Sequence, residues 1–147
     1  MRRDDSGSAI IEFVFVAVLV MVPLVYLVVA VAAVQRSELA VSHAAREAGR
    51  AFATADSSAR AVARVDAAVR IALRNQGVSD ADVKYVPAGS SCDAGAVVPS
   101  LRAGARFTVC VTRHVDVPAV PKFLSGKGIT TVGKYVVHVD DYREADG

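Results

Sequence analysis

SGSAIIEFVFVAVLVMVPL, residues 6–24 of the chain, decides how this protein folds. It opens an apolar run in which the 22 residues from Phe13 to Val34 carry no charge. As an α-helix at 1.5 Å per residue, that run is about 33 Å long, which matches a hydrocarbon core about 30 Å thick. The run is therefore predicted to cross a membrane as one helix, with Glu12 just before it.

Two other interpretations of the apolar run compete with a retained anchor. A buried core helix does not fit, because so long a run leaves no polar face. A cleaved secretory signal stays open as an alternative, with Arg2 and Arg3 as its basic start and Ala30-Val31-Ala32 as a cleavage site. The run is longer than the 7–15 residues usual in such signals. We expect a retained anchor, and the basic residues before it favour a cytoplasmic N-terminus.

Gly7 lies five residues before Glu12, and Phe13 follows the glutamate. A glycine, four small or apolar residues, a glutamate and an aromatic residue ahead of a single span resemble the processing site of type IV prepilins. The pattern is most similar to the TadE-like pseudopilins of tight-adherence (Flp) pilus systems. The resemblance extends over residues 6–53 and implies a pilin-like fold, with a long anchor helix and a compact head.

The resemblance also implies a site, a location and partners. A membrane-embedded prepilin peptidase would cut the Gly7–Ser8 bond, which makes residues 1–7 a leader peptide. Residues 8–35 would be a single transmembrane helix in the cytoplasmic membrane, and residues 36–147 an extracytoplasmic α+β head. The expected partners are the peptidase, other pilin or pseudopilin subunits and the pilus assembly platform.

Physical arguments for Gly7 and Glu12 accompany the resemblance. Glycine has no Cβ, so its backbone can enter a tight peptidase cleft. Cleavage would free an α-amine at Ser8, which is cationic at neutral pH. That amine would lie one helical turn from Glu12, or face Glu12 of a neighbouring subunit, and the two opposite charges attract strongly in lipid. Glu12 is thus predicted to set the register of helix assembly; the alternative is that its carboxylate snorkels to the headgroups.

Pro23 lies inside the predicted span. A proline there removes one helical hydrogen bond and bends the helix, which membrane helices tolerate. The sequence predicts a kink at Pro23, and both a packing role and an incidental kink stay open.

The helical pattern continues beyond the span to Ala53. Residues 54–58, TADSS, then predict a break and a new N-cap, followed by a second amphipathic helix to about Asn75. One apolar stripe is expected on this helix, formed by Val62, Val65, Val69 and Ala72.

Period-two alternation predicts strands at residues 83–86, 106–113 and 131–139, which would form a small antiparallel sheet. In the middle strand, Thr108 and Cys110 fall on the polar side of the alternation. Residues 114–128, HVDVPAVPKFLSGKG, separate the last two strands. Their apolar side chains either tuck onto the head or contact a partner or the membrane surface.

Cys92 and Cys110 both follow the span. If the span exports them, they lie in an oxidising compartment and are expected to pair. The alternative is two buried free thiols.

No catalytic, cofactor-binding or metal-binding residues are predicted. The two His-Val-Asp pairs, at residues 114–116 and 138–140, offer too few ligands for a convincing metal site. Neither a phosphate-binding loop nor a nucleophile elbow occurs. A net charge of +2 without a nucleic-acid-binding motif argues against nucleic acid as a partner. The remaining alternative to the pseudopilin is a membrane-anchored or secreted binding module without a filament role.

Overall fold

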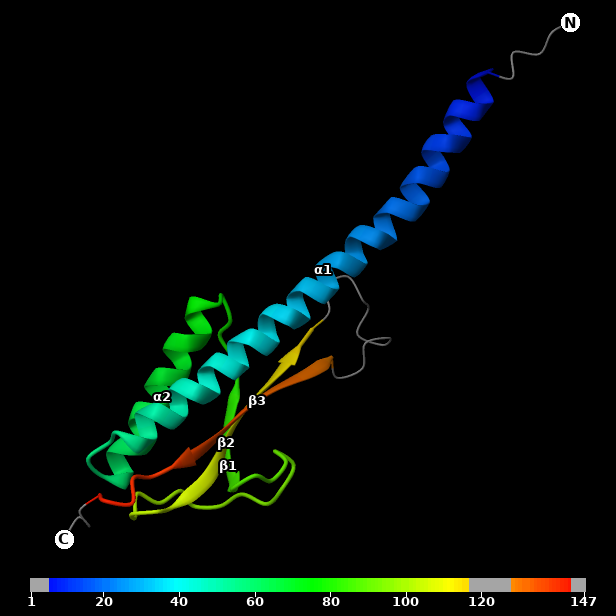
Figure 1. Ribbon diagram of the computed structural model, residues 1–147. Helices are drawn as coiled ribbons and strands as arrows, with labels where there is room; N and C mark the ends of the chain where they lie inside the picture. Colours follow the sequence, from blue (N-terminus) through cyan, green and yellow to red (C-terminus); the bar gives the residue numbers. More distant parts are fainter. Residues whose placement is uncertain (1–5, 117–127, 144–147) are drawn as a thin grey trace, which may run out of the picture.

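The computed structural model describes residues 6–116 and 128–143, without the side chains of residues 6–9. The elements, in chain order, are α1 (Ser6–Ala53), α2 (Ser58–Asn75), β1 (Asp82–Pro87), β2 (Arg106–Val115) and β3 (Ile129–His138). A long apolar helix, a second helix and an antiparallel three-stranded sheet confirm the predicted α+β class. Figure 1 shows the N-terminal half of α1 projecting from the head as a single rod.

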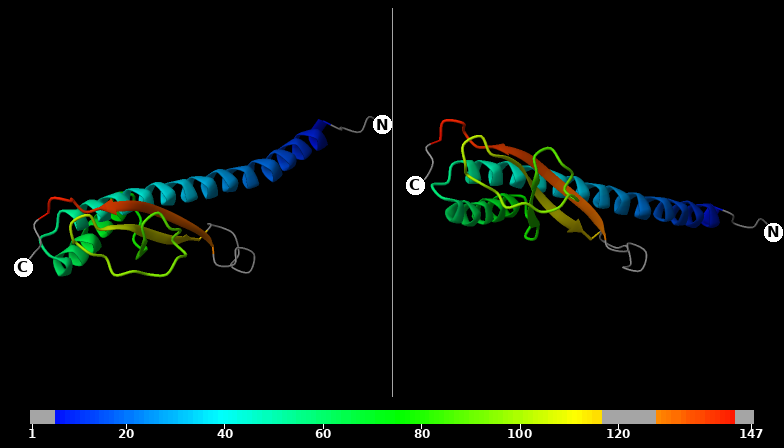
Figure 2. Two further views of the ribbon diagram at one scale, coloured as in Figure 1. Left: turned by 60° about the horizontal axis from the view of Figure 1, so that its bottom comes forward. Right: turned by 90° about the horizontal axis from the view of Figure 1, so that it is seen from below.

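Helix α1 is the longest element and runs through both the projecting part and the head (Figure 1). Its 48 residues amount to about 72 Å of helix. Pro23 lies inside α1 without ending it. The N-terminal part of the helix curves gently in the left view of Figure 2, and the assignment of this curvature to Pro23 stays a prediction.

The C-terminal half of α1 forms the centre of the head. A stripe of fully buried residues runs along it, with Phe52 at its end and small residues before it: Ala40, Val41, Ala44, Ala45 and Ala48. Figure 2 shows α1 and α2 on one face of the sheet and the chain between β1 and β2 on the other. Because alanines are small, both α2 and the sheet can approach α1 closely.

The buried stripe of α2 differs by one position from the predicted stripe. Val65, Val69 and Ala72 are buried as expected, but Val62 is 42% exposed and Ala61 is buried in its place. Neighbouring positions on a helix differ by about 100°, so Ala61 and Val62 cannot both face α1. The small side chain faces inward here, where α2 begins directly after the turn from α1.

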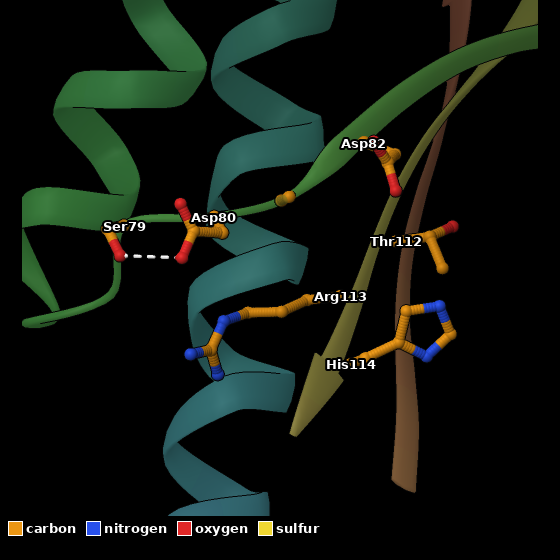
Figure 3. A pocket seen from close by; sticks show the side chains of 7 residues that line it. Ser79, Asp80, Asp82, Thr112, Arg113 and His114 are labelled. Atoms are coloured by element: carbon orange, nitrogen blue, oxygen red, sulfur yellow. Dashed lines mark hydrogen bonds between the residues drawn. The ribbon is translucent and has the colours of Figure 1, made fainter. Parts of the chain in front are cut away.

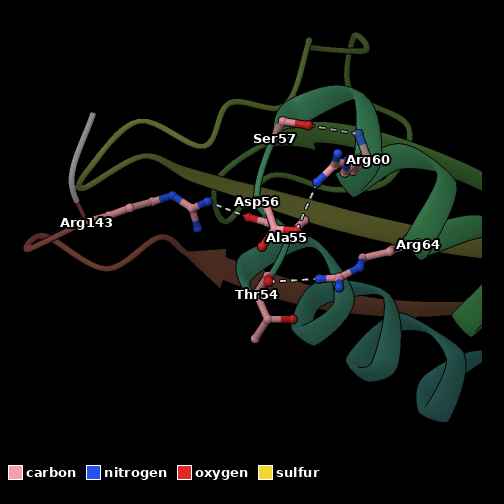
Figure 4. Close-up of polar contacts among 7 residues, drawn as sticks. All are labelled: Thr54, Ala55, Asp56, Ser57, Arg60, Arg64 and Arg143. Atoms are coloured by element: carbon pink, nitrogen blue, oxygen red, sulfur yellow. Dashed lines mark hydrogen bonds and ion pairs between the residues drawn. The ribbon is translucent and has the colours of Figure 1, made fainter. Parts of the chain in front are cut away.

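The turn between α1 and α2 is held by arginines and a cap (Figure 4). Ser57 is the N-cap of α2, and its Oγ accepts from the backbone N–H of Arg60 at 3.4 Å. Arg64 donates to the carbonyl of Thr54 at 2.9 Å, and Arg143 donates to the carbonyls of Ala53 and Ala55. Cations at a helix C-terminus satisfy free carbonyls and complement the helix dipole. Arg143 thereby ties the C-terminal segment to the end of α1.

β2 is the central strand of the sheet, between β1 and β3. The prediction that Thr108 and Cys110 lie on a polar face is wrong, since both are buried. The chain between β1 and β2 covers that face: the N–H of Gly89 donates to Thr108 Oγ1 at 3.0 Å, and Cys92 is bonded to Cys110. The two cysteines have Cα atoms 5.8 Å apart, and the predicted disulfide is present in the structure.

Two glycines allow α1 and β3 to cross in close contact. A Cβ on Gly133 would collide with the backbone carbonyl of Val41, and a Cβ on Gly49 would collide with the ring of Tyr135. A glycine in a strand often marks such a close backbone approach. The segment between β2 and β3 with the apolar side chains Val117, Val120, Phe123 and Leu124 lies largely outside the described residues.

Candidate functional site

The projecting half of α1 is apolar on all sides. Between Ile10 and Val31 it carries 18 large apolar side chains that are 47–73% exposed. Soluble monomers rarely expose contiguous apolar patches beyond a few hundred Å². The helix is long and apolar enough to cross a membrane, and none of its most apolar window is buried against the head. This half of α1 therefore needs lipid or another helix around it.

The apolar half joins the head without a linker. Val34 ends the uncharged run, and Ser37, three residues later, is already fully buried in the head. Both residues belong to the same helix. The position of the head is therefore mechanically coupled to the position of the apolar helix.

The predicted processing residues lie together at the N-terminal end of α1. Gly7 and Ser8 belong to its first turns, and their side chains are outside the described part. Glu12 is exposed, and none of the ion pairs among the described residues involves it. Phe13 is 73% exposed. The Gly7–Ser8 bond thus lies in the first turns of the described part of α1.

A polar cluster, formed by the buried Ser37 and Thr131 and the half-buried Arg113, marks the junction of apolar helix and head. Ser37 Oγ and Thr131 Oγ1 share a hydrogen bond of 2.7 Å. Arg113 Nη1 donates to Ser37 Oγ at 3.4 Å, and Thr131 Oγ1 donates to the carbonyl of Arg113 at 3.3 Å. Sequence reasoning missed this cluster. Its one signal is that Ser37 precedes Ala40, Val41 and Ala44 at helical spacing, so a polar residue extends an apolar stripe.

The two His-Val-Asp pairs do not come together. His114 lies opposite Thr130 and His138 lies opposite Arg106, which places the histidines toward opposite ends of β2. His114 shares a hydrogen bond of 2.9 Å with Thr130, and His138 lies 3.3 Å from Asp141. Within residues 10–116 and 128–143, no three His, Cys, Asp or Glu side chains gather in a way that would hold a metal ion.

Comparison of the chain with protein-family models, curated proteins and solved structures finds no match.

Proposed function

We propose that this chain is a minor pseudopilin of a tight-adherence pilus or of a related secretion machine. A prepilin peptidase removes residues 1–7, so that the mature chain begins at Ser8. Residues 8–35 span the cytoplasmic membrane with the N-terminus in the cytoplasm, and the head, residues 36–147, lies outside. The role is structural rather than catalytic: the chain joins pilin subunits and the assembly platform.

The uncovered apolar half of α1 is the observation that carries this proposal. A simple anchor needs only enough apolar residues to cross the bilayer. Here the same helix also forms the centre of the head, through Ala40, Val41 and Ala44. Any helix that packs against the apolar half in lipid therefore also determines where the head stands. Such coupling suits a subunit that must be placed in an ordered assembly.

Glu12 and the new amine of Ser8 supply the register of that assembly. The two positions are four residues apart, about 6 Å along the helix axis. A neighbouring copy shifted by about 6 Å would therefore bring its amine level with Glu12. In a medium of low dielectric constant a paired charge is strongly favoured over an unpaired one. The pair forms only after cleavage, so it also delays assembly until the leader has been removed.

The identity of the first residue of the mature chain tests the proposal. The full chain is expressed in a host that contains a prepilin peptidase, purified from membranes, and measured by intact mass and N-terminal sequencing. The proposal expects Ser8 as the first residue. An intact Met1 would support the membrane-anchored binding module instead, and a chain that starts shortly after Ala32 would identify a secreted one.

Gly7→Ala tests whether the peptidase depends on the glycine. The added methyl group should block entry into the cleft, so the leader stays attached. Ser6→Ala adds no strain one residue earlier and serves as the matched control, with normal processing. Normal processing of Gly7→Ala would show that a prepilin peptidase does not make this cut.

A further inference from the structure

The end of the head at which β2 ends and β3 begins lies beside the end of the apolar helix. Thr131 on β3 is bonded to Ser37, and Gly133 lies against Val41, so β3 begins near the span and runs away from it. Ser37 is three residues beyond Val34, about 4.5 Å along a helix. The headgroup layer on each side of a bilayer is about 5–8 Å thick. When α1 spans a membrane, Ser37 and Thr131 therefore lie at headgroup depth.

A hollow opens at this level along one edge of β2. β1 pairs with β2 only as far as Asp82, which lies opposite Thr112, whereas β2 continues to Val115. From Arg113 onward, none of the described residues therefore forms a strand beside this edge of β2. The hollow has a volume of about 390 Å³ and is lined by residues 79–82 and by Thr112, Arg113 and His114 (Figure 3).

The hollow contains a cation and an anion that are not paired with each other. Figure 3 shows Arg113 reaching toward α1 on the same side of β2 as Asp80 and Ser79. The Nε of Arg113 is buried and has no hydrogen-bond partner among the described residues. Asp80 accepts a hydrogen bond of 2.9 Å from Ser79, and the ion pairs found in the described part of the chain do not include it.

These charges select the chemistry of a ligand. Arg113 lines the hollow, and its guanidinium has more N–H groups than the one it donates to Ser37. A phosphate oxygen in the hollow could accept from them in charge-assisted hydrogen bonds. Asp80, with Asp82 at the same hollow, disfavours a ligand that carries only negative charge. An ammonium group beside the phosphate would be attracted to these carboxylates and could donate hydrogen bonds to them. A trimethylammonium group could not, because it has no N–H.

We propose that this hollow binds the headgroup of a phospholipid of the phosphoethanolamine type. Arg113 binds the phosphate and Asp80 binds the ammonium, while the acyl chains lie along the apolar half of α1. The inference rests on the proposed function, since it requires the span to stay in the membrane. It adds a lipid that holds the head at a fixed height before assembly.

Lipid competition on the full-length chain tests the site. The delipidated protein receives equimolar phosphatidylethanolamine, phosphatidylcholine and phosphatidylglycerol with identical acyl chains, and bound lipids are counted by native mass spectrometry. We expect phosphatidylethanolamine to be favoured on the order of tenfold, which is what one additional charged hydrogen bond supports. Soluble phosphoethanolamine is the control for the free headgroup. Displacement of the lipid at equal concentration would overturn the lipid as the ligand.

Three variants assign the preference to the hollow. Arg113→Gln should abolish the preference, and Asp80→Asn, at an exposed position between α2 and β1, should shift it to phosphatidylglycerol. Arg102→Gln is the matched control: it is exposed in the chain leading to the start of β2, away from the hollow, and should keep the preference. Equal binding of the three lipids by the wild type, or an unchanged preference in Asp80→Asn, would overturn the inference.

The test separates this inference from the proposed function. Unselective lipid binding by a chain that begins at Ser8 overturns the lipid site and leaves the pseudopilin intact. A mature chain that begins shortly after Ala32 has lost its span, and that result overturns both.

Discussion

Among single residues, Glu12 is the one on which the assembly proposal depends most. Glu12→Gln keeps the size of the side chain but removes the charge that attracts the Ser8 amine. We expect normal cleavage but a loss on the order of tenfold in assembled subunits, corresponding to about 1.4 kcal/mol. Intact mass reports cleavage, and chemical cross-linking in membranes reports assembly.

Glu38→Gln is the matched control for Glu12, because Glu38 is an exposed glutamate of α1 beyond the apolar run. It should assemble normally. Unchanged assembly of Glu12→Gln would support the snorkelling interpretation.

Tyr85 makes a second prediction at this scale. Its ring packs with Phe52 and Phe107, at centroid distances of 6.1 and 5.9 Å. Burial raises the pKa of Tyr85 above its usual value of 10.0, and the negative charge of Asp66 adds to the shift. The folded state therefore holds this proton more tightly than the unfolded state. The resulting stability is complete below the unfolded pKa and is lost as pH rises through the folded pKa.

We expect the free energy of unfolding to fall as pH rises above 10.0, the ordinary pKa of tyrosine. The fall should be smaller in Tyr85→Phe. Tyr142→Phe is the control, since Tyr142 is 95% exposed and should leave the profile unchanged. Denaturant titrations across this pH range measure the effect, and identical profiles for wild type and Tyr85→Phe would contradict it.

At the scale of elements, the crossing of α1 and β3 is the contact least tolerant of change. Gly133→Ala would push a methyl group into the carbonyl of Val41, so the helix and the strand must move apart. We expect a loss of about 1–3 kcal/mol in the free energy of unfolding, typical of overpacking. Gly95→Ala adds the same methyl group where no atom lies within 4 Å and should be neutral. Urea unfolding followed by circular dichroism measures the free energy of unfolding of both variants. Equal stabilities would show that α1 and β3 can move apart without cost to the fold.

The disulfide makes a second prediction at the scale of elements. It joins β2 to the chain that covers its outer face, with a sequence separation of 18 residues. The chain-entropy model gives about 3 kcal/mol for a loop of this size. Reductant should lower the free energy of unfolding of the wild type by about this amount, and a Cys92→Ala/Cys110→Ala variant should be equally weakened and insensitive to reductant. A wild type that ignores reductant would contradict the prediction.

Much at this scale could be predicted from the sequence. The C-terminal end of α1, the N-cap region and the end of α2 could be predicted because Asp56, Ser57 and Ser58 follow α1 and Gly77 follows α2. The projecting half of α1 could be predicted because a head of this size cannot surround so long an apolar run. Alternation located β2 and β3 to within a few residues.

What the sequence did not predict depends on contacts between distant segments. The alternation places Thr108 and Cys110 on the solvent-facing side of the sheet. They are buried only because the chain between β1 and β2 packs over that side. Arg113 and Thr131 acquire their roles only through Ser37, from which Thr131 is separated by 94 residues. Gly133 did carry a local signal, since a glycine within a strand indicates a close backbone approach.

At the scale of the whole molecule, one helix fixes the head relative to the span. Inserting two alanines between Val34 and Gln35 would turn the head by about 200° and lift it by about 3 Å. Four alanines would turn it by only about 40° beyond a full rotation and lift it by about 6 Å. If neighbouring heads must meet correctly, the two-residue insertion should assemble worse than the four-residue one, although both heads fold. Cross-linking in membranes measures this, and equal assembly would show that the direction of the head is irrelevant.

The contact between Ser37 and Thr131 also has a consequence in time. The last strand, β3, closes over a helix that is among the first segments of the chain, and Arg143 completes the turn after α1. A head that leaves the cytoplasm in chain order therefore stays incomplete until the C-terminal residues arrive, because α2 and β2 can already pack on α1 but β3 cannot. Long-range closure of this kind folds slowly. Translocation of the C-terminus, rather than formation of the helices, then sets the moment at which the head becomes a finished subunit.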